Sequence, residues 1–175
     1  MHLHTTVPEV QLVSWQPEHQ QELVAQANDR AVWRNLFDTF PHPYTSADAE
    51  FWIGHVSEPQ PSCHFCILVD GRVAGGIGIE VGTGTEVKTG QFGYWLGTAY
   101  WGRGVATAAA SAVVSHARAC MPLARLQAPI FAWNHRSMRV AEKVGFSREA
   151  VLRSSVFKDG ELIDSVLYAL ILSDA

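Results

Sequence analysis

The fold of this chain is decided by the stretch Gly93-Tyr94-Trp95-Leu96-Gly97-Thr98-Ala99-Tyr100-Trp101-Gly102-Arg103-Gly104-Val105-Ala106-Thr107. Its first part is rich in aromatic residues, which favour a β-strand. A short loop with two glycines around an arginine follows, and an alanine-rich run that favours a helix comes directly after it. The order therefore predicts a strand, a loop and a helix.

The loop has the features of an anion site. The start of a helix presents unpaired backbone N–H groups and a partial positive charge. Gly102 and Gly104 lack the Cβ atoms that would keep an anion away from the backbone, and Arg103 adds a fixed positive charge. The stretch predicts a pyrophosphate cradle, and an ordinary tight turn before a helix is the alternative reading of this motif by itself.

Composition limits the class of protein. A chain of 175 residues with 47% hydrophobic content suits one domain, which we place over residues 1–175. The net charge is -4, and the 13 basic residues are spread along the chain, so we expect no nucleic-acid partner. The first residues lack the pattern of a secretion signal, and no apolar run is long enough to cross a bilayer. We therefore expect a cytoplasmic protein without a membrane partner.

The chain has three cysteines, and two of them form the sequence Cys63-His64-Phe65-Cys66. This spacing could suggest redox chemistry or a zinc site. Cysteines three apart on a strand point to opposite faces, however, and zinc would need more ligands. We favour buried, small apolar side chains and expect no metal, and a cysteine-based redox or metal protein is the weakest of the alternatives.

The rest of the sequence predicts a mixed sheet with flanking helices. Two Asp-Gly pairs, Asp70-Gly71 and Asp159-Gly160, predict antiparallel hairpins. The strand–helix–strand order from Thr89 to Trp133 predicts a right-handed parallel crossover. The expected strands are Glu9–Trp15, Cys63–Val69, Arg72–Val81, Thr89–Leu96, Leu126–Trp133, Phe146–Phe157 and Leu162–Leu172. Helices are expected at Pro17–Asn28, around Val32 to Phe37, after an N-cap at Thr45, at Arg103–Ala119 and at Ser137–Val144, where Gly145 ends the helix.

Two spaced motifs resemble one family. The run from Gly102 to Thr107 resembles the acetyl-CoA loop of the GNAT superfamily of N-acetyltransferases, Gln/Arg-x-x-Gly-x-Gly/Ala, whose positions are filled here by Trp101, Gly104 and Ala106. Downstream, Asn134-His135-Arg136-Ser137 and Glu142-Lys143-Val144-Gly145-Phe146 are similar to the motif Asn-x-x-Ser…Glu-Lys-x-Gly-Phe of the Rim-type branch, the ribosomal-protein N-terminal acetyltransferases. Two motifs in the family's order are more specific than either alone.

The resemblance implies a fold and a cofactor. The fold class is α/β (α+β mixed): a single GNAT-like domain with a central mixed, mostly antiparallel sheet, a splayed parallel strand pair and flanking helices. Acetyl-CoA would lie in the splay as co-substrate. Analogy with the family also suggests a homodimer. The cofactor-binding residues that it implies are Tyr94, Trp95, Leu96, Trp101, Gly102, Arg103, Gly104, Val105, Ala106, Thr107 and Asn134.

An aromatic and proline-rich loop precedes the main sheet, where the family builds its acceptor site. The resemblance makes Phe40, His42 and Tyr44 candidate substrate contacts. For His42 and Tyr44 a purely structural role is equally favoured. We expect Phe51 and Trp52 to be core residues.

The catalytic roles are only partly assigned by the resemblance. Ser137 stands where the Rim-type branch has a serine that can protonate the leaving thiolate, whereas physical reasoning alone favours a helix cap there. Many relatives have a tyrosine where this chain has Ala141, and glutamates where it has Gln91 or Val156. The general base is therefore unassigned, with Glu80, His42 and Asp164 as guesses.

The leading hypothesis is an acetyl-CoA-dependent N-acetyltransferase that moves acetyl to a primary amine by direct attack in a ternary complex. A protein N-terminal α-amine is the first choice of acceptor, and a small-molecule amine such as a polyamine or an antibiotic is the second. The alternative is a non-catalytic acyl-CoA-binding module.

Overall fold

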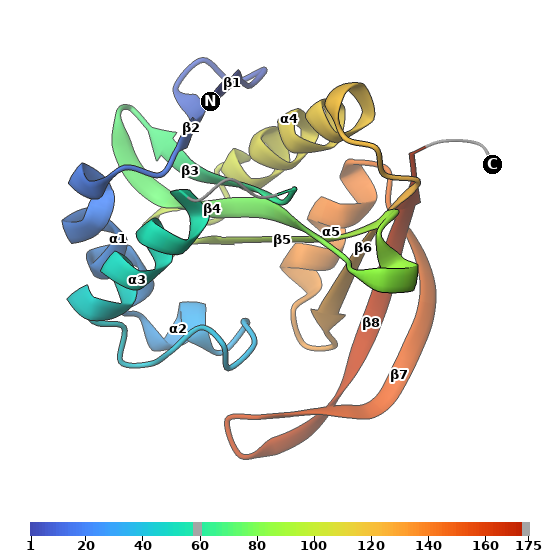
Figure 1. Ribbon diagram of the computed structural model, residues 1–175. Coiled ribbons are helices and arrows are strands. Elements are labelled where there is room, and N and C mark those ends of the chain that lie inside the picture. Colours follow the sequence, from blue (N-terminus) through green and yellow to red (C-terminus); the bar gives the residue numbers. More distant parts are fainter. Residues whose placement is uncertain (58–60, 173–175) are drawn as a thin grey trace.

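The computed structural model describes residues 1–57 and 61–172. Within them an eight-stranded sheet has the order β1-β2-β3-β4-β5-β6-β8-β7 (Figure 1). The strands are β1 (His2–His4), β2 (Val10–Ser14), β3 (Cys63–Val69), β4 (Arg72–Val81), β5 (Thr89–Leu96), β6 (Arg125–Phe131), β7 (Ser147–Lys158) and β8 (Glu161–Ile171). The helices are α1 (Gln20–Ala27), α2 (Arg30–Trp33), α3 (Ser46–Ser57), α4 (Val105–Cys120) and α5 (His135–Lys143).

Helices cover both faces of the sheet and create two apolar cores. Alternation along β3 sends Phe65 and Ile67 into one core, which α4 and α5 cover. The residue between them, Cys66, faces the other core, to which α1 and α3 contribute Leu23 and Ile53. The predicted mixed, mostly antiparallel sheet with flanking helices is confirmed.

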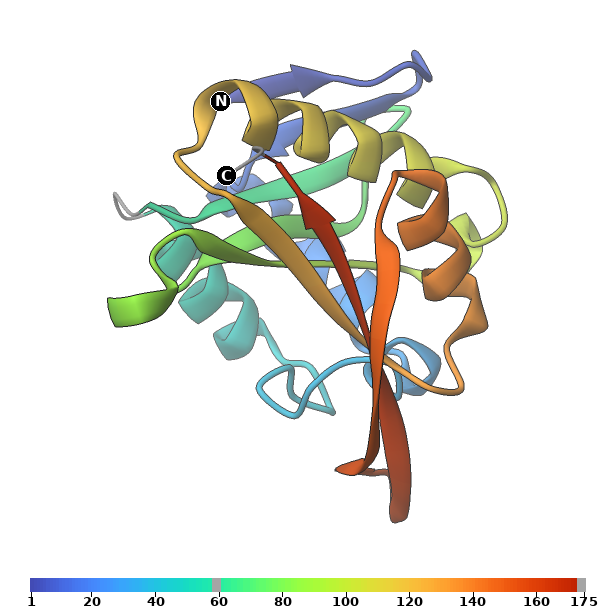
Figure 2. The same ribbon diagram turned by 90° about the vertical axis from the view of Figure 1, so that its right-hand side faces the viewer.

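The splay that positions the site lies between β5 and β6. These two strands are parallel, and their pairing covers only Thr89–Gln91 on β5 and Arg125–Gln127 on β6. Beyond this short ladder they diverge, and Figure 2 shows β6 and β8 running away from the line of β5. The second half of β5, from Phe92 to Leu96, therefore has its β6-facing edge open to another binding partner.

The β3–β4 hairpin is confirmed, with Asp70 and Gly71 at φ values of 50° and 76° as a two-residue turn of this type requires. The register shifts between Ile67, which pairs with Gly75, and Leu68, which pairs with Val73. One residue of β4, Ala74, is thus extra, which is a β-bulge. Next to the bulge, Gly75 of β4 lies close to the backbone of β5 at Trp95 and Leu96.

Gly75 provides a stability test of this close approach. A Cβ there would collide with the main-chain oxygen of Trp95, which cannot move aside as a side-chain end could. We expect Gly75→Ala to destabilise the protein by about 1–3 kcal/mol, the usual cost of overpacking. Gly54 on α3 is the matched control, because a Cβ built there meets no described atom within 4 Å apart from its chain neighbours and the backbone of its own helix. Gly54→Ala should stabilise by about 0.5–1 kcal/mol through helix propensity. Denaturant titration measures both, and equal effects would contradict the close approach.

One strand is additional to the prediction, and two local predictions change or gain detail. The strand β1 was not predicted. Helix α2 ends at Trp33 rather than extending to Phe37. The cap of α3 is confirmed, because the carboxylate of Asp48 accepts hydrogen bonds from the backbone N–H and the hydroxyl of Thr45. Among the described residues, no helix combines the length and the apolar character needed to cross a membrane.

Candidate active site

The loop before α4 has the backbone conformation that an anion cradle needs. Gly102 and Gly104 have φ values of 74° and 81°, in the left-handed region that favours glycine. Gly104 is the N-cap of α4, and no described side chain caps the helix start there. A Cβ built at either glycine would meet no described atom within 4 Å apart from its chain neighbours. The first N–H groups of α4 are therefore accessible to an anion, which supports the predicted role of the run from Gly102 to Thr107.

Two arginines flank this loop, and the sequence had indicated only one of them. The guanidinium of Arg103 lies 5.6 Å from the ring centroid of Tyr100. The guanidinium of Arg136, at the start of α5, lies 5.4 Å from the ring of Trp101. The indole Nε1 of Trp101 donates to the carbonyl of Leu96 at 2.8 Å, so the loop folds back onto the end of β5. Trp101 thus fixes the loop to the end of β5, and its ring lies beside a second positive charge, that of Arg136.

Asn134 and Ser137 meet β5 at the start of α5. The side-chain oxygen of Asn134 accepts from the backbone N–H of Ser137 at 3.1 Å, which makes Asn134 the helix cap. The cap that physical reasoning placed at Ser137 is therefore provided by Asn134. A side-chain hydrogen bond joins Ser137 to Tyr94. Burial raises the pKa of Tyr94, and this hydrogen bond only partly opposes the rise, so the phenol is protonated at neutral pH. Ala141, one turn further along α5, is 4% exposed and faces the core.

A cavity of about 650 Å³ opens on the other face of the sheet, between β4, β5, α3 and the loop after α2. Its lining is rich in aromatic side chains, and its floor is formed by cross-strand pairs of β4 and β5. These pairs are Glu80 with Gln91, Gly78 with Gly93, and Gly76 with Trp95. The floor thus runs from a polar end, over two glycines, to an aromatic end. No described atom lies within 4 Å of a Cβ built at Gly93, so the middle of the floor is open.

The polar end contains a hydrogen-bonded pair of His64 and Glu80 that sequence reasoning missed. The Nε2 atom of His64 lies 3.0 Å from the carboxylate of Glu80, whose other oxygen accepts from Ser62 at 3.1 Å. The His64 ring packs edge-on against Trp52 at 5.2 Å and lies over Gly78, where a Cβ would be 2.5 Å from Nδ1. Burial lowers the pKa of His64, Glu80 partly opposes this effect, and His55 adds to it. The imidazole is neutral at neutral pH.

The three predicted substrate residues do not all reach the cavity. Phe40 lines it and contacts both Tyr44 and Trp95, with ring centroids 4.9 Å and 5.5 Å apart. Tyr44 also lines the cavity but is 4% exposed, and burial followed by the charge of Asp48 raises its pKa to about 12. His42 is not among the described lining residues and stacks on Trp33 instead.

The expectation that Phe51 and Trp52 are core residues is wrong for Phe51. Phe51 is 75% exposed and forms part of the cavity rim. Trp52 is half-buried, packs against the core under α3 and also lines the cavity. The apolar run on α3 therefore contributes both to packing and to the cavity wall.

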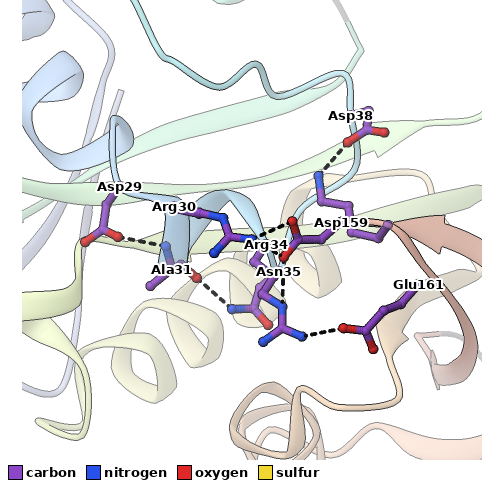
Figure 3. A network of polar contacts seen from close by, with 9 residues as sticks. Asp29, Arg30, Ala31, Arg34, Asn35, Asp38, Asp159 and Glu161 are labelled. Carbon is purple, nitrogen blue, oxygen red and sulfur yellow. Dashed lines mark hydrogen bonds and ion pairs between the residues drawn. The ribbon is translucent and has the colours of Figure 1, made fainter.

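Ion pairs fix the cavity wall that follows α2. Arg30 and Arg34 both contact the carboxylate of Asp159 at the tip of the β7–β8 hairpin (Figure 3). Lys158, which is 2% exposed, pairs with Asp38 and lies 3.6 Å from the ring of Trp33. These contacts hold the segment that carries Phe37 and Phe40 against a part of the chain about 120 residues away.

The cysteines show no sign of a reactive pair. Cys66 is buried, and burial raises the pKa of its thiol. Cys63 lies against the sulfur of Met121 at 3.7 Å, and burial raises the pKa of its thiol to about 11. Thiols of this kind are inert rather than nucleophilic. Across residues 1–57 and 61–172, no group of three or more His, Cys, Asp or Glu side chains could hold a metal ion.

Comparison with known proteins gives consistent results at the sequence level. The family described as an acetyltransferase (GNAT) domain matches residues 9–147. A probable N-acetyltransferase, YjcK of Bacillus subtilis (strain 168), is 32% identical over 119 residues, which is 67% of this chain and 66% of YjcK. A putative ribosomal N-acetyltransferase of the same organism, YdaF, is 29% identical over 105 residues, 60% of this chain and 57% of YdaF. The chain thus spans less than two thirds of these curated relatives.

Solved structures share the fold at low sequence identity. RimL, a ribosomal L7/L12 alpha-N-protein acetyltransferase solved with coenzyme A, superposes with a TM-score of 0.86 at 17% identity over 97% of both chains. Mycobacterium smegmatis RimJ, solved with a CoA disulfide, also gives a TM-score of 0.86, at 22% identity over 98% of this chain and 87% of RimJ. These likenesses establish that the arrangement of strands and helices is shared.

Proposed function

Because the chain belongs to the GNAT acetyltransferase family, we propose that it transfers the acetyl group of acetyl-CoA to a primary amine by direct attack in a ternary complex. One observation carries the proposal. The glycine loop before α4 is joined through Trp101 to the end of β5, and the same strand forms the floor of the cavity at Gly93 and Trp95. A cofactor with its pyrophosphate at the loop and its arm along β5 would deliver its thioester to the cavity.

The cofactor side offers the groups that thioester chemistry needs. Acyl transfer requires stabilisation of an oxyanion and a proton for the departing thiolate. Backbone N–H groups of β5 beyond Gln91, where β6 has diverged, would serve the oxyanion. Asn134 uses its side-chain oxygen as a helix cap, so its amide nitrogen is available to the pantetheine arm. Ser137, in contact with Tyr94, would protonate the thiolate.

Both acceptor classes have support. The names of YdaF and RimL point to ribosomal-protein α-amines for those proteins, which favours a protein N-terminus here. The aromatic cavity of about 650 Å³ falls in the range of small-molecule sites. The proposal common to both is a primary amine.

Calorimetry and thiol release test the proposed reaction together. We expect acetyl-CoA to bind the full chain, and we expect free thiol to appear faster when an amine is added. The panel should contain an N-terminal serine peptide, a polyamine and aromatic amines, with product mass confirming the N-acetyl group. Binding of acetyl-CoA without thiol release from any amine would instead favour the non-catalytic acyl-CoA-binding module.

A further inference from the structure

The cavity is divided into two chemically different ends. At one end, Phe40, Tyr44, Trp15 and Trp95 surround the floor position of Gly76. At the other end, Glu80 and Gln91 form the neighbouring floor pair and His64 lies above them. Gly93, between the two ends, leaves the floor open beside β5, where the thioester of the proposed reaction would arrive.

We propose that the acceptor is a small primary amine on an aromatic or bulky apolar body, with this body at the Phe40–Trp95 end and its nitrogen directed toward Glu80 and His64. The inference rests on the proposed acetyl transfer and specifies its acceptor. The apolar end excludes water and has aromatic rings that can pack against a ring of the ligand. A polyamine or a hydroxylated amine would have to bury polar groups there without partners, which is unfavourable.

The polar end is arranged to remove a proton from the amine. Nε2 of His64 faces the carboxylate of Glu80, so its proton is donated there and Nδ1 becomes the unprotonated acceptor. Nδ1 lies over Gly78, which is paired directly with Gly93 on the open part of the floor. Trp52 packs on the edge of the ring, and Ser62 holds the second oxygen of Glu80. The pair is therefore fixed in position beside the expected site of attack.

The reaction then balances in protons and electrons. The bound ammonium gives its first proton to Nδ1 of His64, and the imidazolium that forms is stabilised by the carboxylate of Glu80 at Nε2. After the products leave, Nδ1 returns this proton to solvent, which restores the ring for the next turnover. The nitrogen lone pair forms the C–N bond, and the carbonyl π electrons move to oxygen. As the C–S bond breaks, the hydroxyl of Ser137 gives its proton to the departing thiolate and receives the second proton of the nitrogen in exchange, so the serine is restored. The products are the N-acetyl amine, the thiol of coenzyme A and one released proton.

The acceptor class is tested by comparing amines on the wild-type full chain at one pH. The probes are 2-phenylethylamine, ethanolamine, spermidine and a serine-starting peptide, each with acetyl-CoA. We expect kcat/KM for 2-phenylethylamine to exceed that for the other three by about tenfold or more, the discrimination that an apolar pocket can supply. Equal or better turnover of ethanolamine, spermidine or the peptide would overturn the inference while the acetyl transfer itself stands. No turnover of any amine would overturn both.

A substitution of Phe40 in the cavity wall distinguishes loss of the apolar binding site from a general loss of activity. Phe40→Ala should raise KM for 2-phenylethylamine about tenfold and leave KM for ethanolamine nearly unchanged, because only the first uses the apolar end. Phe157 is the matched control, since it is a phenylalanine with 70% exposure on the hairpin. Phe157→Ala should change neither KM. If Phe40→Ala affects both amines equally, the apolar end does not bind the acceptor.

The pH dependence of kcat tests whether His64 is the proton acceptor. In the wild type, kcat should rise with pH through the pKa of His64. This pKa lies below its ordinary value because burial lowers it more than Glu80 raises it, and His55 lowers it further. His64→Gln should lower kcat by roughly one to three decades and abolish this acidic limb, with acetyl-CoA binding retained. Glu80→Gln should lower kcat and displace the limb. An unchanged pH profile in His64→Gln would overturn the role of this pair.

Discussion

Gly104→Val should lose acetyl-CoA binding by about a hundredfold or more. The substitution places a branched side chain at the N-cap of α4, over the N–H groups that the proposed cradle presents to pyrophosphate. Each hydrogen bond to a charged group contributes about 1.5–3 kcal/mol, and 1.4 kcal/mol corresponds to a factor of ten in affinity. The loss of one or two such bonds is enough for the expected effect. Titration calorimetry with acetyl-CoA measures it directly.

The φ of +81° at Gly104 means that valine also strains the backbone, so the test needs a control with the same strain. Gly71 provides it, with φ +76° and no described atom within 4 Å of a Cβ, in the β3–β4 turn. Gly71→Val should lower the melting temperature to a similar extent and leave acetyl-CoA affinity unchanged. If Gly104→Val binds as the wild type does, or if both variants lose binding equally, the pyrophosphate lies elsewhere.

The parts of this site that could be predicted from sequence depend on local chemistry. Glycines in the left-handed region at Gly102 and Gly104, and the Asp-Gly turn at Asp70, require particular residues at particular positions. At α5 the cap was expected at Ser137 and is Asn134, whereas the glycine after the last turn, Gly145, is a local signal that was identified correctly. These features can be identified before any tertiary contact is known.

The features that were missed depend on register and on distant contacts. His64 lies over Gly78 because these residues pair across β3 and β4, and the bulge that sets the neighbouring register is not visible in the strand pattern. The alternating Gly76 and Gly78 were the available signal, since missing side chains on one face leave room for something above them. Phe51 was misplaced because three consecutive large apolar residues on α3 do not define which side faces solvent.

Ser137→Ala should lower kcat by roughly one to three decades with acetyl-CoA affinity nearly retained, which is the range expected for the loss of a general acid. The stability of the helix should change little, because the cap of α5 is the side-chain oxygen of Asn134 bonded to a backbone N–H that alanine keeps. Steady-state kinetics with the best amine, corrected for folded protein by calorimetry, measures the effect. Asn134→Ala should instead lower the free energy of unfolding by about 1 kcal/mol, because it removes the cap of α5.

Tyr94 is the second possible source of the proton, because burial keeps its phenol protonated and it is hydrogen-bonded to Ser137. Tyr94→Phe separates the two. If the serine hydroxyl delivers the proton, Tyr94→Phe retains most of kcat and Ser137→Ala does not. If the phenol delivers it and the serine only orients the phenol, Tyr94→Phe has the larger effect and Ser137→Ala the smaller. Undiminished kcat in both variants would mean that the thiolate leaves without either group, and the proposed acid would have to be abandoned.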